Sequence, residues 1–436
     1  MRVKSQYSLG ALSLLVLIQA FFIRQDQFVA SLLVFSAGFG FYLLEGNAKY
    51  QNELVSKRLN LFLKLTLLFA FPRGSDDLYR FFWDGQLLIQ GYHPYAFKPD
   101  QLTGHLQPFQ ETIYEHLNSP GYYSVYPPLL QSLFGLCALA SFKSVFLFSV
   151  LWKSLLLLAD QLLLRYIGKL PALNSRTAFW YMWNPLVLLE IAGNGHPEGL
   201  LIPALILSFY LLQYHRTALS SFALGLAAGI KLFPIALLPL FARHLGLRKA
   251  IPYAFLTAMV FLVLMLPVWP YGDHFLSSVK LYFQKFEFNG SLYEIWKAIE
   301  FRRHGHNNIG FIGKVIPVIF IAFTGLIVLI QKQNHFQKLL QSCLLVWTGY
   351  LLLSTTVHPW YVLPLIPLGL LSGFIFPLAW SGAILLSYSW YNADLDESWK
   401  YACSIMEYVI LLGAMIFDFA RKGAKALRIS IGPHLP

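Results

Sequence analysis

The chain has 436 residues, of which 57% are hydrophobic and only 12% are charged. An ordinary water-soluble domain carries about 25% charged residues, so this composition excludes one. The formal net charge of +12 would suit nucleic acid. The basic residues, however, lie in short tracts between apolar stretches, which is typical of membrane topology signals and argues against a nucleic-acid partner.

Apolar stretches near the ~20 residues needed to cross a bilayer recur along the chain. They are continuously apolar, so they predict helices and not the alternating strands of a transmembrane barrel. We therefore expect an all-α polytopic bundle of about 12–14 membrane segments, forming one membrane domain over residues 1–436 in contact with the lipid bilayer. The clearest segments are 7–23, 28–44, 144–164, 251–268, 309–330, 339–354 and 402–420.

The basic tracts predict the topology. Assigned to the cytoplasm, they place both termini inside, and the protein is expected in a plasma (inner) membrane with its active site facing outward. The tracts are Lys49/Lys57/Arg58, Arg165/Lys169/Arg176, Arg243/Arg248/Lys249, Lys332/Lys338 and Arg421/Lys422/Lys425/Arg428. The opposite side then receives a first long loop at 73–125, a second long loop at 269–308, and shorter segments at 192–198, 355–360 and 391–400.

Two apolar segments do not fit simple crossing helices. Residues 126–141 are short for a span and begin with Pro127 and Pro128, so we expect a helix that dips into the outer leaflet. Residues 219–242 contain Gly225, Gly229, Lys231 and Pro234, which predict two short legs that meet near the outer side. Broken helices at membrane depth predict a cavity there.

The first long loop carries the acids that could do chemistry. Ser75 is a plausible N-cap for a helix that begins at Asp76. On such a helix Asp77, Arg80 and Asp84 share one face, while its apolar residues can lie against the membrane surface. Catalytic carboxylates at a bilayer boundary are one interpretation of this pattern, and a solvated amphipathic helix is the other.

Polar residues near the other outer helix ends could bind substrate. His196 and Glu198 lie in the turn at 193–199, which could equally serve only to end helices. Lys231 is the only charge between Ala218 and Ala242, and it could bind phosphate or simply extend to the interface. His358 follows the span at 339–354 and could be a ligand.

The second long loop contains Arg302 and Arg303, on the side that positive-inside topology keeps poor in basic residues. An anionic partner would explain them, and solvated side chains are the alternative. His304 and His306 do not have the spacing of a metal site, so we predict no metal ligands. Cys137, Cys343 and Cys403 all lie in apolar segments and predict buried thiols.

Taken in order, the motifs resemble the GT-C superfamily of membrane glycosyltransferases, and within it the polyprenyl-phosphate-mannose-dependent mannosyltransferases. The resemblance covers most of residues 60–370 and depends on the order and common side of the motifs. They are Asp76-Asp77, Trp83-Asp84-Gly85, Gly91-Tyr92-His93-Pro94-Tyr95, Tyr126-Pro127-Pro128-Leu129, Trp183-Asn184-Pro185, the 193–199 turn, Gly229-Ile230-Lys231 and His358-Pro359-Trp360-Tyr361.

The resemblance implies an inverting transfer of a hexose, with mannose first, from a polyprenyl-phosphate donor to a lipid or glycan acceptor. It assigns the general base to Asp76 or Asp77 and brings Lys231 to the donor phosphate. A carboxylate near the acceptor hydroxyl and a cation near the departing phosphate are what this chemistry needs. No cofactor is required, although a divalent metal could bridge carboxylate and phosphate.

Two other functions remain open at this point. A transporter or flippase of lipid-linked sugar would also contain broken helices and an isolated membrane lysine, but carriers often show inverted repeats and none is visible here. An oligosaccharide polymerase or ligase would use a large arginine-bearing outer loop such as 269–308. The acids lie instead in the first loop, at 73–125, which favours the transferase.

Overall fold

The structure is a computed structural model that describes residues 2–47, 53–105, 108–167, 175–333 and 335–430. Lys49 and Lys169 of the predicted basic tracts lie outside these residues. Within them the regular elements are helices, and the β pairing is one isolated bridge between Phe288 and Thr356. The all-α polytopic prediction is thus confirmed. Helices satisfy their own backbone hydrogen bonds, which a segment in hydrocarbon must do.

The first half of the chain supplies the N-terminal hairpin, the helix of the first loop and a group of core helices. Their bounds are α1 (Arg2–Phe22), α2 (Phe28–Gly46), α3 (Glu53–Leu67), α4 (Asp77–Ile89), η1 (Pro99–His105), α5 (Pro108–Tyr114), α6 (Pro128–Ala140), α7 (Val145–Ile167), α8 (Ser175–Met182), α9 (Pro185–Val187), the π-helix η2 (Leu188–Gly193) and α10 (Glu198–Gln213).

The second half completes the bundle and ends on its longest helix. The bounds are α11 (Thr217–Ile230), η3 (Phe233–Leu237), α12 (Leu238–Leu245), α13 (Leu247–Met265), η4 (Leu266–Tyr271), α14 (Gly272–Gln284), α15 (Leu292–His304), α16 (Ile309–Ile330), α17 (Phe336–Leu353), η5 (Pro359–Val362), α18 (Leu365–Ser372), α19 (Phe376–Ala383), η6 (Ile384–Tyr391) and α20 (Glu397–Ser430).

Five helical segments of the described chain are long and apolar enough to cross a membrane. They are Phe28–Gly46, Val145–Arg165, Leu247–Leu281, Ile309–Ile330 and Glu397–Gly423. A pair bent by 117°, Pro185–Gly193 with Glu198–Gln213, makes a sixth if it is counted as one span. Five shorter apolar helices lie among them. The chain is therefore a multi-pass membrane protein, and the larger count of 12–14 segments stays a prediction.

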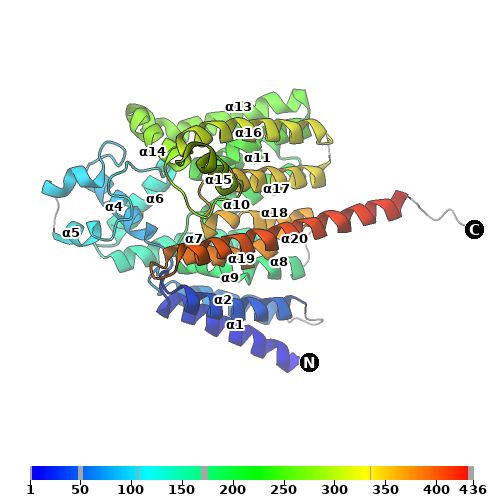
Figure 1. Ribbon diagram of the computed structural model, residues 1–436, viewed down its shortest axis with the longest axis horizontal. Helices are drawn as coiled ribbons and strands as arrows, with labels where there is room; N and C mark the ends of the chain where they lie inside the picture. Colours follow the sequence, from blue (N-terminus) through cyan, green and yellow to red (C-terminus); the bar gives the residue numbers. More distant parts are fainter. Residues whose placement is uncertain (1, 48–52, 106–107, 168–174, 334, 431–436) are drawn as a thin grey trace, which may run out of the picture.

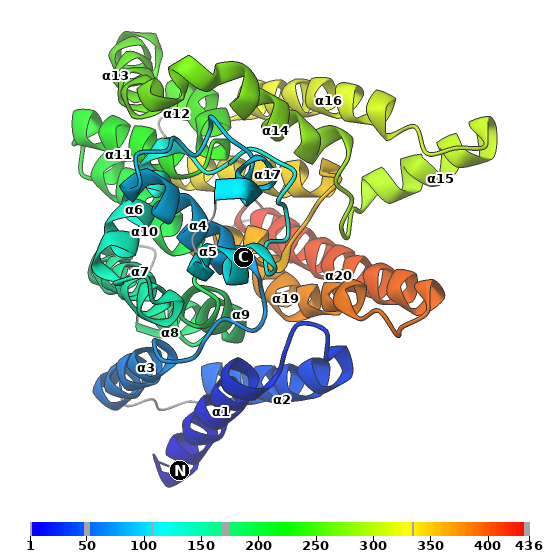
Figure 2. The ribbon, with the colours of Figure 1, turned by 90° about the vertical axis from the view of Figure 1, so that its left-hand side faces the viewer.

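The long helices run side by side, with α4, α5 and α6 gathered at one end of the bundle (Figure 1). The first residues of α1 and the last residues of α20 lie toward the opposite end (Figure 1). Seen along the bundle from the end that carries α4 and α5, the α1–α2 pair forms a separate flank below the other helices (Figure 2). One large buried cluster runs through the bundle, and it includes Phe81, Trp152, Trp183 and Trp380.

Both irregular segments predicted from the sequence are present. The 126–141 segment forms the short helix α6, which packs closely against α4. The 219–242 segment breaks at Lys231, whose extended backbone (φ −144°, ψ 134°) ends α11, and the chain then restarts as η3 and α12. Proline at position 234 explains part of the break, because it cannot continue a helix from the preceding turn.

Helix α4 differs from the prediction in two details. It begins at Asp77 and not at Asp76, and the Asp76 side chain makes no capping hydrogen bond. The Ser75 hydroxyl does accept a hydrogen bond from the Asp77 amide, at 3.2 Å. The sequence allowed the apolar residues of this helix to lie against the membrane surface, but Leu78 and Phe82 are buried instead, because α6 and the core cover them.

Candidate active site

The segments predicted to share one side do meet at one end of the bundle. The Gln25 amide donates to the Arg73 carbonyl at 2.9 Å, which joins the α1–α2 turn to the start of the first loop. The Gly74 amide donates to Asn194 Oδ1 at 3.1 Å, which joins that loop to the 193–199 turn. The common end is confirmed in this way, while the membrane side that it faces stays a prediction.

Asp77 is a partly exposed acid that faces the 193–199 turn. Its Oδ1 accepts a hydrogen bond from Asn118 Nδ2 at 3.0 Å, and its Oδ2 lies 3.9 Å from His196 Nε2. The side chain keeps 20% of its surface exposed. Burial raises the pKa of Asp77, against the lowering effect of His196 and of the Asn118 hydrogen bond. A carboxylate with a raised pKa is a stronger base.

Asp76 occupies a different setting from its neighbour. Its Oδ2 accepts a hydrogen bond from Gln25 Nε2 at 2.8 Å, so it ties the start of α4 to the turn between α1 and α2. The two aspartates that the sequence left as alternatives are thus separated by their partners. Asp77 faces the histidine of the 193–199 turn, whereas Asp76 faces the N-terminal hairpin.

His196 is oriented by an acid that the sequence analysis missed. Its Nδ1 lies 3.0 Å from Glu190 Oε2, which leaves Nε2 directed at Asp77. That Nε2 atom is buried and has no hydrogen-bond partner among the described residues. Tyr388 and Asn194 also donate hydrogen bonds to the Glu190 carboxylate, at 2.8 and 3.0 Å. The imidazole is therefore held with Nε2 directed at Asp77 and open to a further hydrogen bond.

Local structure explains why Glu190 reaches this place. Asn184 caps the bent segment by accepting hydrogen bonds from Leu186 and Val187, which gives the Trp-Asn-Pro motif a structural role. The chain then widens into the π-helix that carries Glu190, and π-helical turns are often found at functional sites. Glu190 lies within an apolar run, and a lone acid in such a run was the signal that could have identified it.

Helix α7 holds the turn that carries His196. Trp152 Nε1 donates to the Gly195 carbonyl at 2.6 Å. The Lys153 ammonium donates to the carbonyls of Leu67 and Gly193, at 2.8 and 3.3 Å. Gly195 has a φ of +79°, and a Cβ there would come within 3.2 Å of the Trp152 ring, so glycine suits the position on both grounds. The turn and the end of α3 are thereby held to one helix.

Glu198 and Lys231 form the second charged group of the site. Glu198 is buried, with 2% of its side chain exposed, and pairs with the ammonium of Lys231, whose side chain is 34% exposed. The ammonium also lies 3.9 Å from the centre of the Tyr361 ring. A lysine has three donors, and Glu198 uses one of them. Lys231 therefore neutralises a buried acid while presenting part of its charge at the surface.

An aromatic column joins these groups to His358. The His196 ring stacks on Trp360 at 3.9 Å, and Trp360 stacks on His358 at 4.5 Å with nearly parallel planes. His358 Nδ1 lies 3.2 Å from the Tyr391 hydroxyl, and Phe288 stacks on its other side at 4.5 Å. Burial lowers the pKa of His358 to about 3, helped by the charges of His196 and Lys231. His358 is therefore neutral at ordinary pH.

Arg80 and Asp84 belong to a buried hydrogen-bond network further along the helix that carries Asp77. Arg80 Nε donates to Asp84 Oδ1 at 2.8 Å, and Arg80 also donates to the carbonyls of Ser119 and Tyr122. Gln131 and Ser124 donate to Asp84 Oδ2. Asp84 has none of its side chain exposed, so a substrate has no open side from which to approach it. This network fixes the first loop to α4 and α6.

Arg302 and Arg303 are not brought to this cluster. They lie on the last turn of α15, which packs on α16 and α17, and both are exposed. Neither forms an ion pair with a described residue. Their predicted role in substrate binding therefore has no support from their position. The three predicted buried thiols are confirmed, since Cys137, Cys343 and Cys403 are free and buried.

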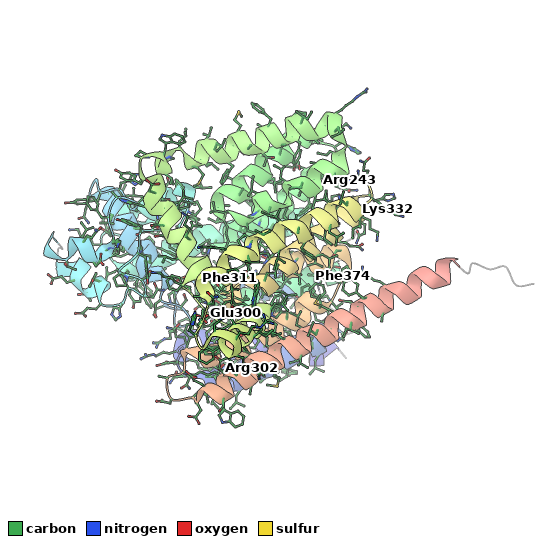
Figure 3. The ribbon with its side chains drawn as sticks, turned by 45° about the horizontal axis from the view of Figure 1, so that its top comes forward. Arg243, Glu300, Arg302, Phe311, Lys332 and Phe374 are labelled. Atoms are coloured by element: carbon green, nitrogen blue, oxygen red, sulfur yellow. The ribbon has the colours of Figure 1, made fainter. Side chains whose placement is uncertain are left out.

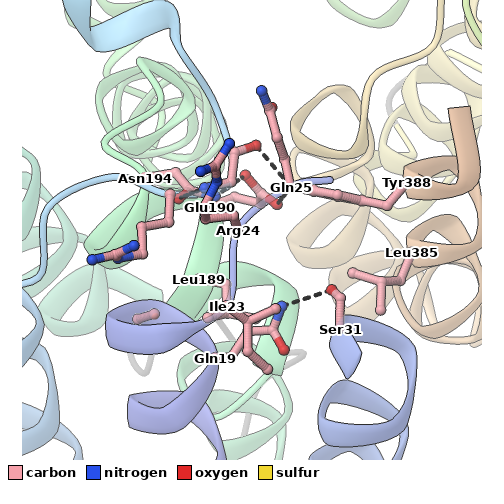
Figure 4. A pocket seen from close by; sticks show the side chains of 13 residues that line it. Gln19, Ile23, Arg24, Gln25, Ser31, Leu189, Glu190, Asn194, Leu385 and Tyr388 are labelled. Atoms are coloured by element: carbon pink, nitrogen blue, oxygen red, sulfur yellow. Dashed lines mark hydrogen bonds between the residues drawn. The ribbon is translucent and has the colours of Figure 1, made fainter. Parts of the chain in front are cut away.

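A small cavity borders Glu190 on the side of the N-terminal hairpin (Figure 4). Gln19 and Gln25 line it from the hairpin, and Gln19 Nε2 donates to Ser31 Oγ across it at 2.7 Å. Gln25 also binds Asp76, so the cavity wall and the start of α4 are joined. Within the described residues no group of three or more His, Cys, Asp or Glu side chains could hold a metal ion.

Comparison with known proteins identifies a family for this chain. A family model described as alpha-(1->6)-mannopyranosyltransferase, N-terminal domain, matches residues 28–246, which is half of the chain. The matched region includes Asp76, Asp77, His196, Glu198 and Lys231, and it ends before His358. The predicted resemblance to GT-C mannosyltransferases is confirmed. Searches of curated proteins and of solved structures found no significant match.

Proposed function

Because the chain belongs to the alpha-(1->6)-mannopyranosyltransferase family, we propose that it moves mannose from a polyprenyl-phosphate donor to a lipid or glycan acceptor, with Asp77 as general base. The protein is a glycosyltransferase, and mannosyl transfer is the activity of its family. The sequence also left carrier and polymerase functions open, but the matching family is neither a carrier nor a polymerase family. The observation that supports the mechanism most is the partly exposed Asp77 carboxylate beside the free nitrogen of His196.

Asp77 meets the requirements of a base better than Asp76. Its raised pKa favours taking a proton, and its exposed surface leaves room for an acceptor hydroxyl. In the proposed step, the hydroxyl oxygen attacks the anomeric carbon as its proton passes to Asp77 and the bond to the phosphate breaks. One displacement inverts the anomeric centre.

His196 has a supporting role in this step. Glu190 fixes the imidazole through Nδ1, so Nε2 is the atom that faces Asp77. At 3.9 Å the two groups are beyond direct hydrogen-bond length, and a small movement or one water would connect them. Burial lowers the pKa of His196, but the hydrogen bond and charge of Glu190 outweigh it and raise that pKa overall. The positive charge that the imidazole then carries favours the deprotonated form of Asp77, which is the form that acts as base.

Lys231 is proposed to bind the donor phosphate. The leaving phosphate carries negative charge, and a fixed ammonium next to it stabilises the transition state more than it stabilises the substrate. Glu198 holds the ammonium in place and shares its charge, and the Tyr361 ring lies beneath it. A donor linked to a membrane lipid also agrees with a site at one end of a membrane bundle.

The test is transfer of radiolabelled mannose in washed membranes that contain the wild type, Asp77→Asn or Asp76→Asn. Synthetic polyprenyl-phosphate-mannose should support incorporation, and a nucleotide-sugar donor should not once polyprenyl-phosphate is absent. Asp77→Asn should lower the rate by about 10²–10⁴-fold, and Asp76→Asn far less. Equal losses in both variants would contradict the assignment of the base, and activity with the nucleotide sugar alone would contradict the donor.

A further inference from the structure

Helix α15 lies across the bundle and not along it. It is seen nearly end-on in Figure 1, where the long helices run horizontally, and lengthwise in Figure 2, which looks along them. It projects from the side of the bundle (Figure 2), in the half that carries α4 (Figure 1). A helix perpendicular to the membrane-crossing helices runs parallel to the membrane plane.

One face of α15 is fixed to the bundle. Tyr293 is buried and packs with Ile312 and Ile316 of α16, and Trp296 packs against the same group. On this side Lys297 binds Glu287 of the preceding loop. These contacts hold α15 in a defined orientation, so its opposite face is also defined.

The opposite face is apolar and exposed. Leu292, Ile295 and Ile299 follow one another at the spacing of a helix face, and they are 49%, 61% and 44% exposed. Trp296 contacts the ring of Phe311 at 6.3 Å, and Phe311 is an exposed residue of the membrane-crossing helix α16. The apolar face of α15 therefore borders the exposed apolar surface of a helix that is long and apolar enough to cross a membrane.

Basic residues end this helix. Arg302 and Arg303 are exposed on its last turn, and neither has an acidic partner among the described residues. Glu300, on the same turn, is already bound by Asn308. Figure 3 shows Arg302, Glu300 and Phe311 close together, whereas Arg243 and Lys332 lie at the opposite end of the bundle. The two arginines are thus free positive charges beside an apolar helix face.

We propose that α15 is an interfacial helix whose apolar face enters the boundary of the bilayer and whose Arg302 and Arg303 bind the headgroup phosphates of anionic phospholipids. An amphipathic helix with an apolar stripe and basic residues binds membranes in this way. Arginine pairs well with phosphate because its fork donates two hydrogen bonds. This explains why two basic residues lie at the end of the bundle that positive-inside topology leaves poor in charge.

The first measurement is the depth of the helix. The full-length protein carries a nitroxide label at Ile295→Cys and is reconstituted in vesicles of phosphatidylcholine and phosphatidylglycerol. Labels at Gln101→Cys in the first loop and Ile321→Cys in α16 serve as water and lipid controls. We expect the label at position 295 to collide with oxygen more than with a water-soluble nickel complex, between the two controls. A result equal to the Gln101 label would overturn the proposal.

The second measurement concerns the headgroup. Photoactivatable phosphatidylglycerol is cross-linked to the reconstituted protein, and labelled peptides of α15 are quantified against photoactivatable phosphatidylcholine. Removing both charges in Arg302→Gln/Arg303→Gln should lower phosphatidylglycerol labelling of α15 by about fivefold for each arginine. The control Arg248→Gln/Lys249→Gln, at the other end of the bundle, should leave it unchanged.

A third arm uses a photoactivatable polyprenyl phosphate. If the arginine variant loses only this label and keeps the phosphatidylglycerol label, the site serves the donor lipid, and the proposal of bulk phospholipid binding is overturned. Equal labelling of α15 by phosphatidylcholine and phosphatidylglycerol would overturn it as well. None of these outcomes depends on mannosyl transfer, so the proposed function and this proposal fail separately.

Discussion

The first turn and the middle of helix α4 carry carboxylates in contrasting surroundings. Asp84 is fully buried and receives hydrogen bonds from Arg80, Ser124 and Gln131. Asp77, two turns earlier, has one hydrogen bond from Asn118 and faces an unpartnered imidazole nitrogen. A carboxylate whose partners are complete stabilises the fold, whereas one left incomplete keeps the capacity to bind and take a proton. The same helix thus provides the frame and the reactive group.

Asp84→Asn should give the largest loss of stability. It leaves the buried Arg80 guanidinium without its counter-charge, and breaking a buried pair costs about 3–5 kcal/mol. Asp77→Asn removes a carboxylate that burial already disfavours, so its free energy of unfolding should change little. Thermal unfolding of the purified protein in detergent measures both. The comparison fails if Asp77→Asn destabilises the protein as much as Asp84→Asn does.

Lys231→Met tests the second charged group. We expect donor affinity to fall by about 2 kcal/mol, or about 30-fold, because a charge-assisted contact with phosphate is lost. The variant also leaves Glu198 buried and unpaired, which lowers stability. The control Lys231→Met/Glu198→Gln should recover stability without recovering affinity. An apparent KM for the donor that returns with stability would mean that Lys231 serves only the fold.

The pH dependence of the rate tests the link between Asp77 and His196. A base works when deprotonated, so activity should be lost as the pH falls through the raised pKa of Asp77. His196 lowers that pKa, and Glu198 raises it. His196→Gln should therefore move the acidic limb of kcat/KM to higher pH. If the limb stays in place, the histidine does not act on Asp77.

The sequence predicted the arrangement of the polar loops better than it predicted the roles of the individual residues in those loops. The basic tracts and the helix break at Lys231 predicted that the polar loops lie together at one end of the bundle, and they do. Both predictions use only local sequence rules. Helix periodicity also put Asp77 and Asp84 on one face, but it could not show that Asp84 is enclosed by side chains of α6 and of the first loop while Asp77 stays partly exposed. The loop patterns did not predict Glu190, because this acid lies within a buried apolar run.

Long-range pairs were beyond prediction for a different reason. Lys231 binds Glu198 across 33 positions of sequence, and His196 meets Trp360 across a larger separation. Such contacts depend on how helices pack, which a single sequence does not specify. The residues were named as candidates from their chemistry, and their pairing came only with the three-dimensional arrangement.

His358→Gln should have the smallest effect of these changes, and it separates the two histidines of the aromatic column. His196 faces a carboxylate, whereas His358 faces the Tyr391 hydroxyl and has a pKa lowered to about 3. A side chain that stays neutral through the working pH range cannot define the acidic limb of the rate. Glutamine keeps a hydrogen-bonding group toward Tyr391 but loses stacking on Trp360, so kcat/KM should fall less than about tenfold, since such ring pairs contribute about 0.5–1.5 kcal/mol. The pH profile of His358→Gln should overlay that of the wild type, while that of His196→Gln is displaced. A displaced profile for His358→Gln would show that both histidines act on the pKa of Asp77, and the distinction between a histidine that tunes the base and a packing histidine would be lost.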